Sequence, residues 1–143
     1  FFTNLKSRKA SEIIGNNSVS LHFSWLSLER QVVIRGDAEL LSRENVDNYF
    51  RGRPRTSQIG AWASRQSEVI TNRAVLENRY ARIEQRFAKV AVPTPEFWGG
   101  YRVSLESIEF WQGGEQRLHD RFCYTPDVLN RTNPKWNIER LAP

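Results

Sequence analysis

The stretch that decides the fold is residues 98–121, WGGYRVSLESIEFWQGGEQRLHDR. Apolar side chains alternate with polar ones from Tyr101 to Leu105 and continue through Phe110, and this period of two is typical of a strand. The pair Gly113-Gly114 then predicts a turn. The pattern therefore indicates a strand, a turn and a second run that can also be extended.

The run after this turn is rich in nitrogen-bearing side chains. If it is extended, Arg117, His119 and Arg121 lie on one face, because side chains alternate along a strand. We expect such a face to bind an anion. A solvated basic rim of a barrel is the alternative that these residues alone leave open.

The same alternation marks two earlier strands. Residues 19–25 place apolar side chains opposite serines and His22, and residues 30–41 follow as a second strand. Consecutive strands favour antiparallel pairing. Further strand segments are expected at residues 1–4, 121–124 and 136–141. The predicted fold class is mainly β, an antiparallel sheet with flanking helices, arranged as a barrel.

Helices are expected between these strands. Ser7 can cap a helix from Arg8 to Ile14, with Gly15 in the left-handed position that often ends a helix. Ser42 can cap a second helix that ends near Phe50, and Pro54 suits the first turn of a third. A fourth is expected over residues 72–89. Its stripe is predicted to face the core and consists of Leu76, Tyr80, Ile83 and Phe87. Residues 126–134 are expected to form a mobile loop.

Length and composition limit the class of protein. A chain of 143 residues suits one domain, here residues 1–143. An apolar content of 39 % with five Trp and eight Phe favours a packed globule. No apolar run approaches the roughly 20 residues needed to cross a bilayer, so we expect a soluble protein without a membrane partner. The single cysteine, Cys123, excludes an internal disulfide and fits a reducing cytoplasm.

The two histidines do not indicate a metal site. His22 and His119 lie far apart, without carboxylates at metal-ligand spacing. We expect no metal. His22, on the polar face of its strand, is expected to be structural or solvent-facing.

The net charge of +5 would suit nucleic acid, an anionic membrane or phosphorylated small molecules. The arrangement of the cations distinguishes these partners. They form three short clusters beside turns or helix starts, at Arg8-Lys9, Arg51 to Arg55 and Arg117 to Arg121. A nucleic-acid surface would place its cations along one face, so no nucleic-acid partner is expected, and small phosphate sites fit better.

Two of these clusters are candidate phosphate sites. Ser7, Arg8 and Lys9 lie at the first turn of a helix, where free backbone N–H groups and the helix dipole favour an anion. A capped surface helix with solvated cations is the alternative. Tyr49, Arg53 and Ser57 recur at intervals of four residues and offer a phenol, a guanidinium and a hydroxyl to a phosphate. A basic corner on the surface is the alternative there.

Other polar and aromatic residues add to this picture. Gln66 and Ser67 offer amide and hydroxyl donors at a helix end, and Trp111 is either a core side chain or a platform for a stacked ring. The sequence contains no GxGxxG, Walker A or GxSxG motif and no plausible Cys–His pair. Phosphate-sized sites interleaved with aromatic residues suggest a phosphorylated cofactor and a phosphorylated substrate.

Six segments together resemble the pyridoxamine 5′-phosphate oxidase family. They are FFTNLKSRKA (1–10), LERQV (28–32), YFRGRPRTSQIGAWASRQS (49–67), FWGGYRVS (97–104), IEFWQGGEQRLHDR (108–121) and ERLAP (139–143). Several motifs in one order over the whole chain are far more specific than any single short pattern. The resemblance implies an FMN-binding split barrel and a homodimer with FMN where the two subunits meet.

The resemblance also implies roles for individual residues. The side chains implied to bind FMN are Thr3, Arg8, Lys9, Gln31, Gln66, Ser67, Trp111 and Arg121. Arg8 and Lys9 would contact its phosphate, and Gln66 and Ser67 would reach it from the neighbouring subunit. The implied substrate phosphate ligands are Tyr49, Arg53 and Ser57. Arg117 and His119, the implied catalytic residues, would flank the pyridine ring of the substrate.

The implied reaction belongs to vitamin B6 metabolism. Pyridoxine or pyridoxamine 5′-phosphate would be oxidised to pyridoxal 5′-phosphate, with O2 as acceptor, giving H2O2 and, from the amine, ammonia. Because the flavin supplies the redox chemistry, the protein has to bind both rings and stabilise charge. Arg117 is a poor base in its usual protonated form, and whether His119 moves a proton is left open by the sequence.

Two departures from the family pattern bear on these expectations. Family chains carry an N-terminal portion with further strands, an Arg-rich FMN-binding strand and a Lys for the substrate phosphate, and this sequence starts after it. If the chain is the whole polypeptide, we expect an incomplete barrel, weak FMN binding and little turnover. Phe2 stands where many relatives have Tyr. The rival hypothesis is a non-catalytic split-barrel protein that binds FMN or pyridoxal phosphate.

Overall fold

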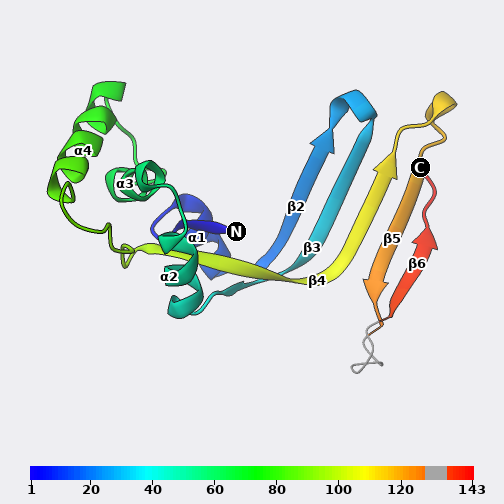
Figure 1. Ribbon diagram of the computed structural model, residues 1–143. Coiled ribbons are helices and arrows are strands. Elements are labelled where there is room, and N and C mark those ends of the chain that lie inside the picture. Colours follow the sequence, from blue (N-terminus) through cyan, green and yellow to red (C-terminus); the bar gives the residue numbers. More distant parts are fainter. Residues whose placement is uncertain (128–134) are drawn as a thin grey trace. The chain divides into compact units, whose positions relative to one another are not determined.

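The computed structural model describes residues 1–127 and 135–143, so most of the predicted loop at 126–134 lies outside the described residues (Figure 1). The chain divides into two compact units. The first consists of Phe1–Gly15 and Glu39–Arg102, and the second of Asn16–Ala38 and Val103–Pro143. Each unit is described by itself below. Among the described residues, no helix is long and apolar enough to cross a bilayer.

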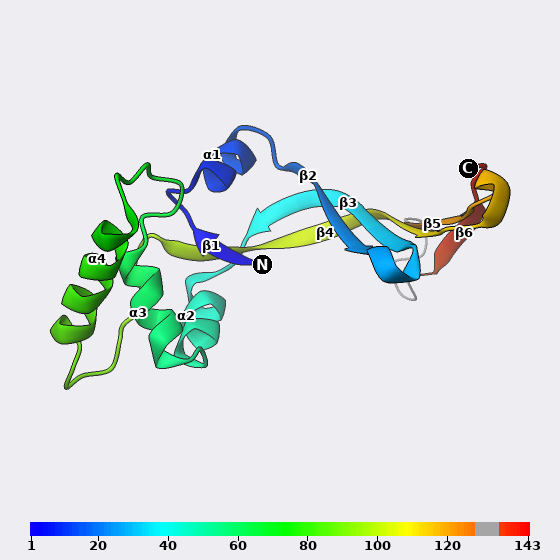
Figure 2. The same cartoon turned by 90° about the horizontal axis from the view of Figure 1, so that it is seen from above.

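The first unit contains a short strand and all four α-helices (Figure 2). Strand β1 (Phe2–Asn4) pairs antiparallel with the start of β4 (Trp98–Gln112), with Phe2 opposite Gly100. The helices are α1 (Arg8–Gly15), α2 (Arg43–Arg51), α3 (Arg55–Ala63) and α4 (Arg73–Arg86). Their order and approximate bounds agree with the sequence pattern.

The predicted helix caps at Ser7 and Ser42 are confirmed. The Ser7 hydroxyl accepts a hydrogen bond from the backbone N–H of Ala10, and the Ser42 hydroxyl accepts one from that of Asn45, each at 3.3 Å. The left-handed conformation predicted for Gly15 is wrong, because no glycine in the described residues has a positive φ. Gly15 is instead the last residue of α1, and the Asn16 side chain makes the following turn by accepting from Ser18 N at 3.1 Å.

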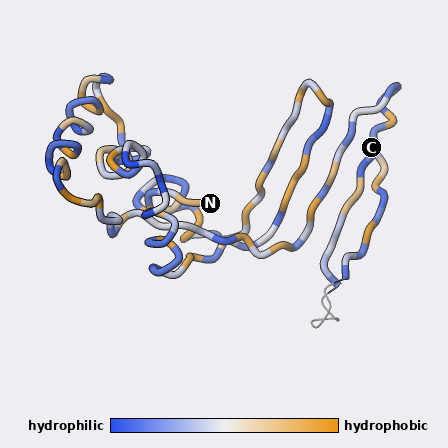
Figure 3. The backbone as a smooth tube through the Cα atoms, viewed as in Figure 1, coloured by the Kyte–Doolittle hydropathy of each residue, from blue (hydrophilic) through white to orange (hydrophobic). Residues whose placement is uncertain are grey.

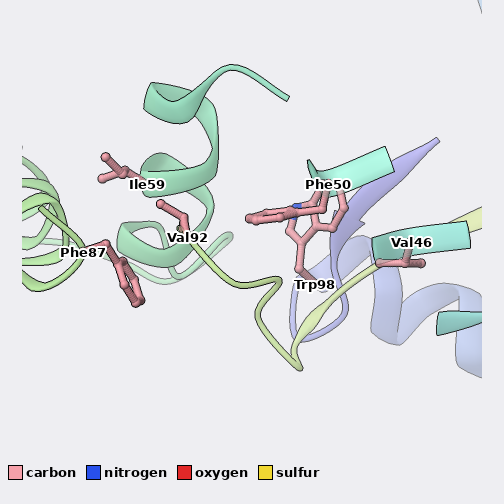
Figure 4. Packing of buried hydrophobic residues seen from close by; sticks show 6 residues of the cluster. All are labelled: Val46, Phe50, Ile59, Phe87, Val92 and Trp98. Atoms are coloured by element: carbon pink, nitrogen blue, oxygen red, sulfur yellow. The ribbon is translucent and has the colours of Figure 1, made fainter. Parts of the chain in front are cut away.

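The core of the first unit lies between α2, α3 and the segment that leads into β4 (Figure 4). Its buried members are Val46, Phe50, Ile59, Phe87, Val92 and Trp98. The predicted stripe of α4 is confirmed in part. Phe87 is buried just past the helix end, and Tyr80 and Ile83 pack against the cluster. Leu76 remains 38 % exposed and is not among the residues packed against this cluster, so its assignment to the core is wrong.

The second unit is the larger part of the antiparallel sheet. Its strands β2 (Ser18–Trp25), β3 (Arg30–Leu40), β4, β5 (Asp120–Pro126) and β6 (Trp136–Arg140) lie in that spatial order (Figure 1). The pairs β2–β3, β4–β5 and β5–β6 are antiparallel. The predicted antiparallel pairing of the first two long strands is therefore confirmed. Gly36 of β3 has no room for a side chain, since a Cβ there would lie 1.8 Å from the Ser104 carbonyl oxygen.

Much of the apolar surface of this sheet is open. Apolar and polar residues alternate along β2 (Figure 3), whereas Val32, Val33 and Ile34 are consecutive in β3. On β2, Phe23 and Trp25 are 46 % and 47 % exposed. Sequence alternation correctly predicted a polar and an apolar face for β2. It overestimated the burial of the apolar face within one chain.

The single extended run predicted after Gly113-Gly114 is wrong in its first half. Residues Glu115–Arg117 form a short 3-10 turn, closed by a hydrogen bond from Leu118 N to Glu115 O at 3.0 Å. Gln116 and Arg117 have left-handed φ values of 54° and 64°. Strand β5 begins only at Asp120, so Arg117 does not share a strand face with Arg121.

Candidate functional site

The first site is a cavity of about 550 Å³ in the first unit, and it joins the three residues predicted to hold the substrate phosphate. Tyr49 comes from the last turn of α2, Arg53 from the corner between helices and Ser57 from the first turn of α3. The break at Gly52 and Pro54 changes the direction of the chain without separating these side chains, all of which line the cavity. This grouping was predicted from the spacing of four residues.

Arg53 is held by aromatic rings and lacks an anionic partner. Its guanidinium carbon lies 4.9 Å from the Trp98 ring centroid and 5.8 Å from that of Phe50. Its Nη1 atom is buried and has no hydrogen-bond partner among the described residues. A buried donor without a partner is costly, and an anion bound in this cavity would satisfy it.

Stacked rings form one wall of the same cavity. The Phe2 ring lies 3.7 Å from the Tyr49 ring at an interplanar angle of 4°, and 5.3 Å from that of Trp98. Phe2 and Trp98 sit on the paired strands β1 and β4. A hydroxyl at position 2 is therefore not needed for this stack. Trp98 was not predicted as a site residue; its place directly before Gly99-Gly100 was the available signal.

Gln66 connects this cavity to the N-terminal strand. Its Oε1 atom accepts hydrogen bonds from Thr3 Oγ1 at 2.8 Å and from Asn4 N at 3.1 Å. In the described part of the chain, no hydrogen bond uses its Nε2 donor. Thr3 and the free amide donor of Gln66 thus lie together within one chain, whereas the family resemblance implied that Gln66 reaches the FMN of the neighbouring subunit.

A second cavity of the first unit, of about 560 Å³, brings Arg8 together with Gln66 and Ser67. Arg8 also forms an exposed ion pair with Glu12 at 2.8 Å, and this hydrogen bond raises the pKa of the guanidinium. Lys9 does not line the cavity; its Nζ lies 5.6 Å from the ring centroid of Phe1. The shared role of Arg8 and Lys9 at one ligand stays a prediction.

Sequence reasoning missed four polar residues of this second cavity, namely Asn4, Lys6, Arg65 and the acidic Glu68. Lys6 and Arg65 immediately precede predicted site residues, and that proximity was the only available signal. Ser67 has a φ of 71°, a left-handed conformation that a serine adopts only when its surroundings hold it there.

The second unit brings Gln31, Trp111 and His119 to one cavity of about 380 Å³. The Trp111 and His119 rings lie 4.8 Å apart. Gln31 Oε1 accepts a hydrogen bond from Nε2 of His22 at 3.0 Å. His22 is exposed, in keeping with the structural or solvent-facing role expected for this histidine. Trp25 lines the same cavity and was not predicted; it ended a strand pattern and was read as one of its apolar positions.

Arg121 and Arg117 lie outside that group. Arg121 Nε donates to Glu109 Oε1 and its Nη1 donates to the Ala142 carbonyl, each at 2.8 Å, so it joins β5 to β4 and to the C-terminal segment. This hydrogen bond from Arg121 lowers the pKa of Glu109. Arg117 is exposed in the 3-10 turn.

Polar donors line a cavity in each unit. In the first unit, Gln66 Nε2 and the Arg8 side chain offer hydrogen bonds that suit a phosphorylated group such as that of FMN. In the second unit, Trp111 and Gln31 line another cavity. The described residues contain no group of three or more His, Cys, Asp or Glu side chains arranged to hold a metal ion.

An antiparallel sheet with these helices defines the class of the flavin-binding split barrels related to pyridoxamine 5′-phosphate oxidase. Residues 1–87 match the family model described as pyridoxamine 5′-phosphate oxidase, and residues 98–143 match that of the pyridoxine 5′-phosphate oxidase C-terminal dimerisation region. The chain belongs to the pyridoxine/pyridoxamine 5′-phosphate oxidase family. The resemblance stated from the six sequence segments is thereby confirmed.

Individual relatives agree with this assignment. The pyridoxine/pyridoxamine 5′-phosphate oxidases of Sodalis glossinidius and Escherichia coli are each 57 % identical over all 143 residues. The chain spans 64 % and 63 % of the length of these two relatives. Among solved structures, PhzG from Burkholderia lata, crystallised with tetrahydrophenazine-1-carboxylic acid, matches the whole chain with a TM-score of 0.84 and 29 % identity, covering 67 % of that protein.

A more distant structure supports the fold alone. The pyridoxamine 5′-phosphate oxidase-related, FMN-binding protein of Nostoc punctiforme covers the whole chain with a TM-score of 0.72 at 12 % identity, and the chain covers 72 % of it. The predicted fold class is confirmed by this match and by the observed sheet of six strands with four α-helices.

Proposed function

We propose that this chain forms the catalytic body of an FMN-dependent oxidase that converts pyridoxine or pyridoxamine 5′-phosphate to pyridoxal 5′-phosphate. Dioxygen would be the final acceptor, with H2O2 as product and ammonia released from the amine. The proposal is supported by the family, by two relatives of that name at 57 % identity, and by the chemistry of the two units.

The observation that carries the proposal is the state of Arg53. A guanidinium fixed against Trp98, with a buried Nη1 that lacks a partner, is prepared for a doubly charged oxyanion such as a phosphate monoester. Tyr49 and Ser57 add hydroxyl donors on the same cavity. We assign this cavity to the phosphate of the B6 substrate.

FMN would supply the acceptor for two electrons and pass them on to dioxygen. The residues that we assign to it are Thr3, Arg8, Lys9, Gln31, Gln66, Ser67, Trp111 and Arg121. Gln66 supports this assignment best, because its Oε1 is already used by β1 while its Nε2 is free for a ligand. Arg121 would act mainly by fixing β5, since its donors are engaged by Glu109 and Ala142.

We assign the ring of the substrate to the neighbourhood of His119 and Arg117. Trp111 and the Gly113-Gly114 turn hold His119, whereas Arg117 is exposed and can move toward a ligand. A protonated guanidinium there would orient the substrate and stabilise negative charge.

The assembly is part of the proposal. The match of residues 98–143 to a dimerisation region supports a homodimer, and we place FMN where two subunits meet. We also propose that both units belong to one flavin-binding domain over residues 1–143, because β3 and β4 each continue from one unit into the other. The single cysteine fits a cytoplasmic protein.

The test is an aerobic assay of the FMN-loaded protein with pyridoxamine 5′-phosphate. We expect formation of H2O2, ammonia and pyridoxal 5′-phosphate in equal amounts. Bound FMN with no product from either B6 substrate would contradict the proposal and favour the non-catalytic binding protein. Failure to bind FMN at all would contradict the cofactor assignment.

A further inference from the structure

The imidazole of His119 is fixed by a backbone amide. Its Nδ1 atom lies 3.2 Å from the backbone nitrogen of Gly114. A backbone N–H can only donate, so Nδ1 must accept, and a neutral imidazole that accepts at Nδ1 carries its hydrogen on Nε2. We infer that His119 is held as the Nε2–H tautomer and serves the proposed oxidation as a hydrogen-bond donor, and that it is not the base. The role, though not the tautomer, rests on the proposed function.

The turn that presents this amide is tightly constrained. Gly113 N donates to the Glu29 carbonyl at 2.7 Å, which ties the turn to the end of the β2–β3 hairpin. Gly114 has no room for a side chain, because a Cβ there would lie 2.2 Å from the Leu118 carbonyl oxygen. The amide that faces His119 therefore has little freedom to move away.

The His119 ring packs against Trp111 on one side, and its Nε2 atom faces a cavity. The Trp111 ring lies 4.8 Å away at an angle of 42°. In the described part of the chain no residue bonds to Nε2, and His119 lines the 380 Å³ cavity with Gln31 and Trp25. The nitrogen that carries the hydrogen is thus the one left for a ligand.

The chemical consequence follows from the lone pairs. Oxidation of an alcohol or amine at carbon removes a hydride from the carbon and a proton from the oxygen or nitrogen. A side chain that takes this proton needs a free lone pair, and neither nitrogen of His119 has one in this arrangement. The proton leaves to water, while Nε2–H donates to a lone pair of the substrate.

Gly114 is then a positioning residue for His119. An imidazolium would present an N–H at Nδ1 to the N–H of Gly114, so two donors would face each other. The amide of Gly114 therefore selects the tautomer of the neutral imidazole. Arg117, three residues on, supplies the permanent positive charge that a neutral His119 does not.

Nitrogen-15 NMR of the imidazole side chains tests the tautomer without any turnover. The full chain, free and loaded with FMN, is compared with its His22→Gln variant, which identifies the His119 signals. We expect a protonated Nε2 and an acceptor-type Nδ1 at pH 8. A protonated Nδ1, or an exchanging mixture of tautomers, would overturn the inference.

Glycine variants test the cause of the tautomer. Gly114→Ala forces the turn to shift, and we expect an exchanging mixture in place of the single tautomer. Gly15→Ala is the matched control, because a Cβ there meets nothing within 4 Å. An unchanged spectrum in a folded Gly114→Ala variant would show that Gly114 does not position His119; if that variant does not fold, the unsubstituted protein still decides the tautomer.

Side-chain replacements test the role. His119→Gln keeps an N–H donor near the position of Nε2, whereas His119→Leu keeps none. We expect kcat/KM to fall about 10- to 100-fold in the Leu variant, the value of a hydrogen bond to a polar or charged group, and to be at least tenfold higher in the Gln variant than in the Leu variant. Equal losses in both, on the order of 10²- to 10⁴-fold, would indicate a base. Loss of oxidation in the unsubstituted protein would instead refute the proposed function and leave the tautomer result standing.

Discussion

Arg53 is the residue whose environment distinguishes a ligand site from a basic surface. Several arginines in the described part of the chain have acidic partners: Arg8 pairs with Glu12, Arg73 with Glu77 and Arg121 with Glu109. Arg53 has aromatic neighbours and a buried donor without a partner. A bound phosphate would accept a hydrogen bond from this donor.

Replacement of Arg53 by alanine should weaken the binding of the substrate far more than the binding of FMN. Loss of a charged hydrogen bond predicts a decrease of about 1.5 to 3 kcal/mol in substrate binding, with FMN affinity changed less than about twofold. Calorimetric titration of the protein with each ligand measures the two affinities. Arg51→Ala is the control, since the Arg51 side chain is exposed and donates to Asn48 within its own helix. Equal losses for both ligands would contradict the assignment of separate sites.

The ion pair between Glu109 and Arg121 predicts a pH dependence of stability. The hydrogen bond from Arg121 lowers the pKa of Glu109 below its ordinary value of 4.5. A group with a lowered pKa in the folded state stabilises the protein above its unfolded pKa, and this stabilisation is lost as the pH falls through the folded value. We expect Glu109→Gln to lower the free energy of unfolding by about 1 to 2 kcal/mol at pH 7 and less at acid pH.

Urea unfolding at a series of pH values measures this difference. Glu106→Gln, an exposed residue of the same strand, is the matched control and should change stability little at any pH. A Glu109→Gln effect that stays constant down to pH 3 would show that the ion pair is not the cause.

At the scale of elements, an arginine at the start of α3 bonds to the chain just past the C-terminal end of α4. Arg55, the first residue of α3, donates to the carbonyl oxygens of Phe87 and Val90, the latter at 3.1 Å. Carbonyls at the end of a helix lack internal partners, and a cation there also interacts favourably with the helix dipole. This one side chain therefore supports the packing of Phe87 into the core.

Arg55→Ala is expected to lower the free energy of unfolding by about 1 to 2 kcal/mol, because two carbonyls lose a charged donor. Thermal or urea unfolding measures the change. Arg73→Ala provides the comparison: its ion pair with Glu77 is solvent-exposed and should be worth no more than about 0.5 kcal/mol. Equal effects of the two substitutions would argue against the role given to Arg55.

The elements also show what sequence patterns can and cannot predict. Side-chain caps are local, so Ser7 and Ser42 were identified correctly, and alternation found the long strands. The turn at Glu115–Arg117 was missed because its left-handed residues are Gln and Arg, which carry no turn signal. Leu76 was misassigned because helical spacing shows which face a residue shares, and not how far the neighbouring helix extends.

The candidate site was predictable to a similar degree. Regular spacing brought Tyr49, Arg53 and Ser57 together, as the cavity shows. Sequence spacing could not predict contacts between distant segments. Examples are the contacts of Thr3 with Gln66 and of Trp98 with Arg53. These contacts depend on how β1 and the helices pack. The family resemblance implied that Thr3 and Gln66 both bind FMN, but with Gln66 reaching it from the neighbouring subunit, so it did not predict their contact within one chain.

At the scale of the whole molecule, exposed apolar residues on the second unit predict association. Phe23, Trp25, Phe110 and Ile138 are each more than 40 % exposed, and two of them lie in the matched dimerisation region. We expect a dimer by sedimentation, and weaker association by at least about tenfold in Phe110→Glu, because burying a charge at an interface is costly. Ile14→Glu, on α1, is the control. A stable monomer, or equal effects of both variants, would contradict this prediction.

The most direct test of the account is the visible spectrum of the FMN-loaded protein before and after anaerobic addition of pyridoxamine 5′-phosphate. We predict that the bands of the oxidised flavin bleach on addition and return when air is admitted. Both ligands and the electron transfer between them would then be established in one sample. Flavin bands that remain unchanged with saturating substrate would contradict the proposed oxidase.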